Sequence, residues 1–223
     1  MATALVTGAN RGIGLALARR LVARGDSVHA VVRQASPELL ALPATVHVGI
    51  ELSDAQALAR LDAALGTTRL DGLWLNAGVL RREALEGFDA AAAQRVLEQF
   101  AINALAPLHL VAVLRHRLGR GAKIALVTSR MGSIADNGSG GYYGYRMSKA
   151  ALNAAGMSLA QDLRGAGIAV CLLHPGYVRT EMTGGAGERS PDEAAAGLLQ
   201  RVDALDLDHS GSFWHADGSP LPW

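Results

Sequence analysis

Short apolar runs and longer amphipathic segments alternate along the whole chain. The apolar runs are too short for helices, so we expect strands at residues 4–7, 27–32, 46–48, 72–75, 123–128, 168–173 and 211–215. Apolar positions spaced three or four apart predict helices at residues 15–23, 54–65, 88–100, 102–118, 145–163 and 191–202. Pro107 marks either the first turn of a helix or a kink.

The order of these elements predicts the fold. Repeated strand–helix units with nearly continuous apolar strands indicate a parallel sheet with helices on both faces. Right-handed crossovers make such a sheet doubly wound, a Rossmann-type α/β fold, and ligands then bind at the carboxyl ends of the strands. No linker, repeat or low-complexity segment divides the chain, so we expect residues 1–223 to form a single domain.

The composition excludes several classes of protein. Half of the residues are apolar, which is ample for a buried core, but only 4% are aromatic, so that core must consist mostly of Ala, Leu and Val. The 21 basic residues nearly balance the 20 acidic ones, and no block of like charges occurs, so nucleic acid is not an expected partner. No spacing of His, Cys and Asp resembles a metal site, and we expect none.

The single cysteine and the start of the chain bear on the compartment. Cys171 lies inside an apolar run, where we expect a buried thiol, and one cysteine forms no disulfide within the chain. No basic segment precedes the first apolar residues, and the longest uncharged stretch, 99–114, is shorter than the ~20 residues that a membrane span needs. We therefore expect a soluble, cytoplasmic protein without a membrane partner.

The first turn of the chain is rich in glycine. Gly8, Gly12 and Gly14 lie between the first strand and the first helix. A strand, a glycine-rich turn and a helix N-terminus place free N–H groups and the helix dipole where a phosphate binds. The spacing is Gly-x-x-x-Gly-x-Gly rather than the common Gly-x-Gly-x-x-Gly, so an ordinary glycine-rich turn remains the alternative.

Tyr145 and Lys149 lie four residues apart at the start of the long helix, so their side chains share one face. Tyrosine has a pKa of about 10, and a nearby ammonium group lowers that pKa because it stabilises the phenolate. We therefore expect an acidified phenol at Tyr145. Such a pair also occurs by chance on helix faces, and the pair alone does not decide the matter.

Polar groups follow three of the predicted strands. They lie in segments 76–78, 128–132 and 175–180, each of which comes directly after a strand. Because the carboxyl ends of parallel strands meet at one edge of the sheet, we expect hydroxyl, amide and phenol groups to converge there. Such groups suit a polarised carbonyl oxygen.

With these motifs in order, the chain resembles the short-chain dehydrogenase/reductase family along essentially its whole length. The carrying residues are Thr7-Gly8-x-x-x-Gly12-Ile13-Gly14, Asn76-Ala77-Gly78, Asn103, Ser129, Tyr145-x-x-x-Lys149 and Pro175-Gly176-x-x-x-Thr180. Within the family, segments 129–134 and 217–223 resemble the C-factor-like branch, close to NADPH-dependent carbonyl reductases.

The resemblance implies a catalytic set of Asn103, Ser129, Tyr145 and Lys149. Tyr145 would protonate the developing alkoxide in reduction or deprotonate the alcohol in oxidation, and Ser129 would hydrogen-bond the same oxygen. Lys149 would hold the nicotinamide ribose and depress the pKa of Tyr145, and Asn103 would anchor a water in a proton relay. Ser133 competes with Ser129 for its role; we prefer Ser129 because it directly follows the strand. Asn103 as a helix irregularity and Ser129 as a turn cap remain alternatives.

The resemblance also implies the residues that bind the dinucleotide: Gly8, Asn10, Arg11, Gly12, Ile13, Gly14, Arg33, Glu51, Leu52, Asn76, Ala77, Gly78, Tyr145, Lys149, Pro175, Gly176, Val178 and Thr180. NAD enzymes usually carry an acidic residue at the end of the second strand, where this chain has Val32 followed by Arg33. Arg33, with Arg11 in the glycine loop, would bind a 2′-phosphate. We therefore expect NADPH or NADP⁺ rather than NAD, although either arginine is equally a plausible solvated surface residue.

Taken together, these features predict an NADPH-dependent oxidoreductase that transfers hydride between nicotinamide and a small carbonyl or alcohol. The alternative is a non-catalytic nucleotide-binding regulator or signalling protein of the same fold. The glycine-rich segment 183–190 is expected to form a short lid over an open pocket. Family resemblance implies a homodimer through the helices that start near Ile102 and Tyr145, whose apolar faces alternatively pack on the sheet.

Overall fold

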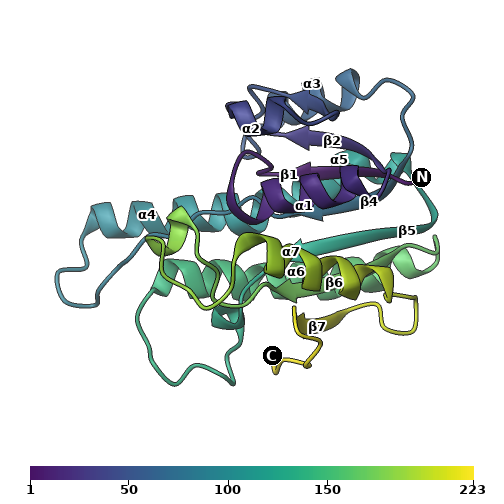
Figure 1. Ribbon diagram of the computed structural model, residues 1–223. Coiled ribbons are helices and arrows are strands. Elements are labelled where there is room, and N and C mark those ends of the chain that lie inside the picture. Colours follow the sequence, from purple (N-terminus) through teal and green to yellow (C-terminus); the bar gives the residue numbers. More distant parts are fainter.

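The computed structural model describes residues 1–223, and a parallel sheet of seven strands forms its centre. The strand order is β3-β2-β1-β4-β5-β6-β7, and all pairs are parallel (Figure 1). Because the order reverses between β1 and β4, a crevice is expected at the carboxyl ends of those two strands. The strands are β1 (Thr3–Thr7), β2 (Ser27–Val31), β3 (Thr45–His47), β4 (Leu70–Leu75), β5 (Leu118–Val127), β6 (Ala169–His174) and β7 (Ser212–His215).

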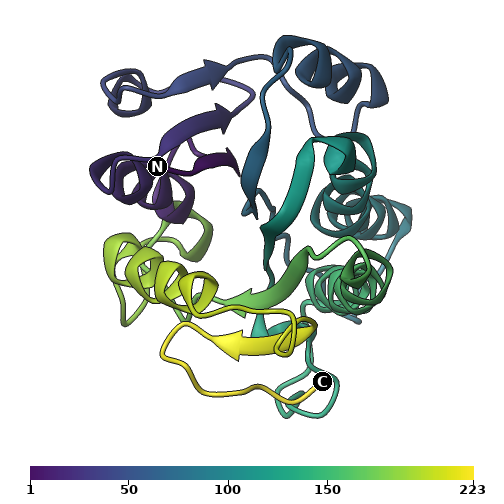
Figure 2. The same cartoon turned by 90° about the vertical axis from the view of Figure 1, so that its right-hand side faces the viewer.

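Helices cover both faces of the sheet, as Figure 2 shows. Helices α1 and α7 pack side by side on one face, and α3, α5 and α6 cover the other. The helices are α1 (Gly12–Ala23), α2 (Pro37–Leu40), α3 (Ala55–Ala64), α4 (Ala90–Phe100), α5 (Ala106–Leu114), α6 (Tyr143–Arg164) and α7 (Pro191–Asp203). The predicted doubly wound α/β fold is confirmed.

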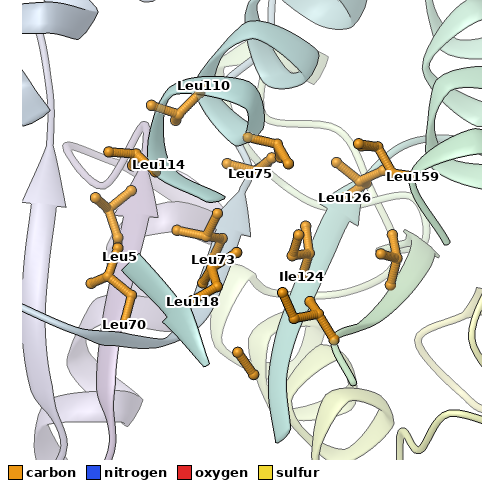
Figure 3. Packing of buried hydrophobic residues seen from close by; sticks show 14 of the residues in the cluster. Leu5, Leu70, Leu73, Leu75, Leu110, Leu114, Leu118, Ile124, Leu126 and Leu159 are labelled. Carbon is orange, nitrogen blue, oxygen red and sulfur yellow. The ribbon is translucent and has the colours of Figure 1, made fainter. Parts of the chain in front are cut away.

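Each face of the sheet has its own hydrophobic core, and Leu, Val and Ala dominate both. Figure 3 shows one of them, where Leu73 and Ile124 of the sheet meet Leu110 and Leu114 of α5. All four side chains are fully buried, and truncating such a leucine to alanine costs about 2–5 kcal/mol of stability. Cys171 is buried in the opposite core, as expected, and burial raises the pKa of its thiol to about 12.

The two helices predicted at 88–100 and 102–118 are in fact one continuous helical segment. A π-helical turn (Ala101–Leu105) joins α4 to α5, and a 3₁₀ turn (Arg115–Arg117) ends the segment. Pro107 has no N–H to donate to the carbonyl of Asn103, and the wider π turn accommodates that missing bond. Of the two predicted alternatives, the structure shows the first: Pro107 lies in the first turn of α5, directly after the π turn.

This segment, Ala90–Arg117, spans 28 residues, and by length and composition alone it passes a test for a membrane-spanning helix. The segment is longer than the uncharged stretch 99–114, because the helix continues past charged residues at both ends. Leu110, Val111 and Leu114 of this segment are buried in the hydrophobic core against the sheet.

Several element boundaries differ from those predicted, and one helix was not predicted. Helix α1 begins at Gly12 because the last two glycines of the loop already belong to its first turn. Strand β5 begins at Leu118, which was expected to end a helix, because Leu118 pairs with Leu70 across a bulge. The short helix α2 was not expected; Ser36 caps it by accepting a hydrogen bond from Leu39 N (3.2 Å).

Candidate active site

A cavity of about 860 Å³ opens at the carboxyl ends of the strands, where the fold predicts a ligand site. The glycine loop lines one part of it, and Tyr145 and Lys149 of α6 line another. Segments that follow β2, β3, β4, β5 and β6 contribute most of the remaining walls. The cavity therefore brings together motifs from positions 8 to 182 of the chain.

The glycine loop is shaped for close approach of a ligand backbone. Gly8 and Gly12 have positive φ angles of 66° and 55°, which side chains rarely allow. A Cβ atom on Gly14 would overlap the carbonyl oxygen of Gly8, so the helix start packs directly on the loop. No side chain caps α1 and no acidic residue lies in its first turn, so its N–H groups remain free for an anion.

Asn76 and Ala77 hold the glycine loop from the end of β4. The Asn76 side-chain amide donates to the carbonyl oxygen of Thr7 (3.1 Å), and the Thr7 hydroxyl accepts from the backbone N–H groups of Asn76 (3.0 Å) and Ala77 (3.1 Å). These contacts bridge the two strands at the point where the strand order reverses. The Asn10 side-chain oxygen lines the same cavity, buried and without a partner, and suits a ligand hydroxyl.

The two arginines predicted to bind phosphate both line the cavity, together with Val32. Each forms an ion pair that was not expected: Arg33 lies 3.6 Å from Glu51, and Arg11 pairs with Glu181. These arginines are largely exposed, so their carboxylate partners hold them only weakly. No acidic residue occupies the Val32 position at the end of β2. The free glycine cradle, the unpaired Asn10 oxygen and these cations fit a dinucleotide.

Tyr145 and Lys149 lie one turn apart on α6, with only 8% and 4% of their surfaces exposed. The Lys149 ammonium nitrogen is 5.7 Å from the centroid of the Tyr145 ring and donates to the carbonyl oxygen of Val127 (2.9 Å). Burial raises the pKa of Tyr145 to about 12, while a hydrogen bond with the Ser129 side chain acts in the opposite direction. Burial also lowers the pKa of Lys149 to about 8.

A lowered pKa at Tyr145 was expected from a desolvated lysine beside a cationic nicotinamide, whereas the chain's own groups raise that pKa. Removing water from around the phenol disfavours the phenolate more strongly than the surrounding groups favour it. The same loss of water favours the neutral amine at Lys149, which weakens the cation that was expected to acidify the phenol.

The structure distinguishes the two candidate serines by their contacts. Ser129 lies just after β5, hydrogen-bonds Tyr145 and also caps the turn Arg130–Gly132, as the alternative predicted, by accepting from the backbone N–H of Met131 (3.1 Å). Ser133 is buried and accepts from the backbone N–H of Asp136 (3.0 Å), which makes it the cap of a turn. Ser129 is thus the serine beside the phenol.

The Asn103 side chain is fully buried in the π turn and has no contact with the cavity. Its oxygen accepts from the backbone N–H of Val79 (2.8 Å), and its amide donates to the Val79 carbonyl (2.8 Å) and to the Ser148 hydroxyl (3.0 Å). The side chain therefore ties the loop after β4 to α6 and is not free to hold a water.

The segment after β6 contributes only part of its predicted set. Pro175 and Thr180 line the cavity, whereas Val178 is buried and is not part of the lining, and Gly176 faces Arg189 and His215 instead. Sequence reasoning also missed lining residues from the ends of other elements: Val31, Gln34, Ile50, Val79, Ile102, Val127, Glu181 and Pro191. Most of them lie next to a predicted strand end or loop, and that position could have identified them from the sequence.

The site combines a cradle for phosphates with a buried phenol and a lysine in one cavity, and a serine lies beside the phenol. On an α/β doubly wound fold, this arrangement defines a nicotinamide-dependent oxidoreductase. Residues 2–191 match the model for the short chain dehydrogenase family. The chain belongs to the short-chain dehydrogenase/reductase family, and it is an NAD(P)-dependent oxidoreductase.

Individual relatives support this assignment over the whole chain. A 1-hydroxy-2-glutathionyl-2-methyl-3-butene dehydrogenase from Rhodococcus sp. (strain AD45) is 40% identical and aligned over 100% of both chains. C-signal from Myxococcus xanthus is 41% identical over 73% of this chain and 93% of its own length. Among solved structures, a carbonyl reductase from Pseudomonas aeruginosa PAO1 has a TM-score of 0.85 at 35% identity, and covers 100% of both chains. The NADPH-bound carbonyl reductase from chicken fatty liver has a TM-score of 0.87 at 29% identity, covering 100% of this chain and 99% of its own.

Proposed function

We propose that this protein is an NADPH-dependent carbonyl reductase that also oxidises the corresponding alcohol. The observation that carries the proposal is the position of Tyr145, hydrogen-bonded to Ser129 and one helical turn from Lys149, in the same cavity as the glycine loop. When bound, the nicotinamide supplies or accepts the hydride. The residues of the chain bind, orient and move the proton.

Tyr145 is the proton donor in reduction. Its pKa of about 12 keeps the phenol protonated at neutral pH, which is the form that donates to a developing alkoxide. Ser129 donates a hydrogen bond to the same substrate oxygen and stabilises the charge that forms there. In oxidation Tyr145 must instead be a phenolate, so that direction depends on a nearby positive charge to lower its pKa.

Lys149 serves as the second proton-bearing group and as a ribose ligand. Its pKa of about 8 lies close to neutral pH, so the amine gains and loses a proton readily. The hydrogen bond to Val127 fixes its ammonium group in place. The Asn103 side chain supports the site because it holds α6 to the loop after β4. We assign the predicted water-anchoring role to the backbone carbonyl of Asn103. In a regular helix this carbonyl would accept from the N–H of residue 107, but Pro107 has no N–H.

NADPH preference rests on the charges at the end of β2. Arg33 and Arg11 line the cavity, and Val32 stands where an acidic residue would repel a 2′-phosphate. A 2′-phosphate would replace Glu51 and Glu181 as the partners of these arginines. Carbonyl reductases with bound NADPH or NADP are among the structures that this chain resembles.

The substrate is proposed to be a small carbonyl compound or alcohol. Segment 183–190 carries three glycines and forms the short lid beside the cavity rim residues Thr180 to Met182. A lid of this length leaves the pocket open and weakly selective. The dehydrogenase from Rhodococcus shows that a relative acts on a glutathionyl-substituted alcohol, which agrees with an accessible site.

We further propose a cytoplasmic homodimer. Leu97, Phe100 and Leu105 project from the helical segment 90–117, and Met147 from α6, and all four remain exposed rather than packed on the sheet. Contiguous apolar helix surface of this kind is typical of a subunit interface. A non-catalytic regulator of the same fold is not favoured, because a pure binder has no need for Tyr145 beside Ser129 and Lys149.

A screen of NADPH consumption over ketones, aldehydes and quinones tests the proposal. We expect turnover of at least one class, with NADPH oxidised faster than NADH. Tight NADPH binding without turnover across the whole panel would support the regulator instead.

A further inference from the structure

Helix α6, which carries Tyr145, begins without a cap of its own. Its N-cap residue, Tyr142, is the only non-glycine residue with a positive φ angle (52°), and its side chain makes no capping hydrogen bond. The first N–H groups of a helix have no partner within the helix, and a buried N–H without an acceptor is costly. An acceptor for this helix start must therefore come from elsewhere in the chain.

Glu83, in the loop between β4 and α4, supplies that acceptor. Its carboxylate accepts a hydrogen bond from the backbone N–H of Gly144 (3.1 Å), the residue that precedes Tyr145. Glu83 is 6% exposed, which is unusual for a glutamate. A carboxylate at a helix N-terminus is stabilised by the helix dipole and by the charge-assisted hydrogen bond.

Gln99 of α4 fixes the second oxygen of this carboxylate. The fully buried Gln99 amide donates to Glu83 (2.6 Å), and its own oxygen accepts from the backbone N–H of Arg81 (2.7 Å). The hydrogen-bond partners of Glu83 are thus amide N–H groups rather than cations. Both carboxylate oxygens are held, and the loop, α4 and α6 meet in one hydrogen-bonded unit.

The packing around Gly144 leaves this unit no room to shift. A Cβ atom on Gly144 would overlap the side-chain nitrogen of Gln99 and lie 3.0 Å from the Cα of Val96. The guanidinium of Arg82 lies 5.4 Å from the centroid of the Tyr142 ring and holds the residue before the helix. Loop residues 81–83 therefore make three contacts around the start of α6. Arg81 contacts the neighbouring helix α4, Arg82 contacts the N-cap residue and Glu83 contacts the first turn.

We propose that Glu83, held by Gln99, is a positioning residue that fixes the first turn of α6 and thereby the phenol of Tyr145. The predicted effect on kcat rests on the proposed function of Tyr145, whereas the predicted effect on the order of the first turn of α6 does not. Replacing the carboxylate with an amide leaves one acceptor oxygen for two donors, so an N–H donor of residue 83 faces either the Gly144 N–H or the Gln99 amide, and the helix start moves or frays. A displacement of about 1 Å at a reacting group costs about 10² in rate.

The test compares Glu83→Gln with Glu86→Gln, a matched change at an exposed glutamate of the same loop. Amide hydrogen exchange is measured over residues 143–147, together with the Kd for NADPH, KM and kcat. We expect faster exchange of the first turn and a kcat lowered by about 10² in Glu83→Gln, with the NADPH Kd unchanged, because the glycine loop is untouched. Glu86→Gln should match the wild type in every measurement.

The double variant Glu83→Gln/Gln99→Glu exchanges the donor and the acceptor of the pair and should restore both slow exchange and kcat. Slow exchange in Glu83→Gln, or fast exchange with an unchanged kcat, would overturn the proposal. If Glu83→Gln does not fold, the double variant decides, and its failure to recover a folded protein would also contradict the proposal. A wild type without carbonyl turnover would refute the proposed function, while the exchange data would still judge the contact between Glu83 and α6.

Discussion

The ammonium nitrogen of Lys149 lies 5.7 Å from the centroid of the Tyr145 ring and donates its hydrogen bond to Val127 rather than to the phenol. Both side chains are buried, and burial shifts both pKa values in the direction that favours the neutral form: Tyr145 up to about 12 and Lys149 down to about 8. The protein thus keeps a neutral phenol and a readily neutralised amine at the end of its cavity. Ionising either side chain in the folded protein therefore lowers the free energy of unfolding.

Replacing Lys149 with Met should stabilise the fold at pH 7 and abolish turnover. The folded pKa of Lys149, about 8, lies below the ordinary value of 10.5, so the unfolded chain binds more protons between these pH values. The contribution of Lys149 to stability is therefore least favourable below pH 8 and improves as pH rises toward 10.5. The difference corresponds to at most about 3 kcal/mol, part of which the missing hydrogen bond to Val127 offsets.

Urea unfolding of the wild type and of Lys149→Met at pH 7 and at pH 10 measures this effect. The advantage of the variant should shrink at pH 10. A variant that is less stable than the wild type at pH 7 would show that the ammonium is well solvated in the folded state.

Replacing Ser129 with Ala should separate the two candidate serines. Ser129 hydrogen-bonds Tyr145, so its removal should lower kcat by about 10²–10³, the usual effect of losing one oxyanion donor. Ser133 caps a turn through Asp136, so Ser133→Ala should lower stability by about 1 kcal/mol with kcat unchanged. Steady-state kinetics and thermal melting of both variants check this, and equal kcat losses would contradict the assignment.

Replacing Val32 with Asp and Arg33 with Leu should move the cofactor preference toward NADH. The new carboxylate repels a 2′-phosphate, and no guanidinium remains at position 33 to pair with it. The ratio of the Kd values for NADPH and NADH, measured by calorimetry, should change by about tenfold or more, because the double variant removes one attraction and introduces one repulsion. Arg60→Leu, at an exposed arginine of α3, is the control. An unchanged ratio would place the phosphate site elsewhere.

Replacing Gly14 with Ala should weaken both the fold and dinucleotide binding. Its Cβ would overlap the carbonyl oxygen of Gly8, and relieving that overlap displaces the glycine loop. Overpacking of this kind costs about 1–3 kcal/mol. Gly119→Ala, in open space on β5, should leave both the melting temperature and the NADPH Kd unchanged. A Gly14→Ala variant with normal affinity would show that the loop is not the phosphate cradle.

The sequence predicted the features that depend on local periodicity and on glycine. Seven strands, the parallel sheet and the glycine loop follow from short apolar runs and from positions where a Cβ does not fit. The boundaries of β5 and α5 were wrong because Leu118 is equally apolar in a helix and in a strand, and only its pairing with Leu70 decides.

The contacts that the sequence did not reveal join residues far apart in the chain. Arg82 and Glu83 are charged residues of the kind found in ordinary solvated loops. Only the fold shows that Glu83 caps α6 and that Arg82 lies over the ring of Tyr142. The rise that burial causes in the pKa of Tyr145 was not predicted, because spacing shows which charges lie near the phenol but not how much water is removed from it.

The most direct test of this account is the Tyr145→Phe variant, compared with Tyr143→Phe two residues earlier on the same helix. The account predicts that Tyr145→Phe lowers kcat for carbonyl reduction by about 10²–10⁴, while the NADPH Kd stays close to that of the wild type and Tyr143→Phe retains full activity. Turnover by Tyr145→Phe at the wild-type rate would contradict it.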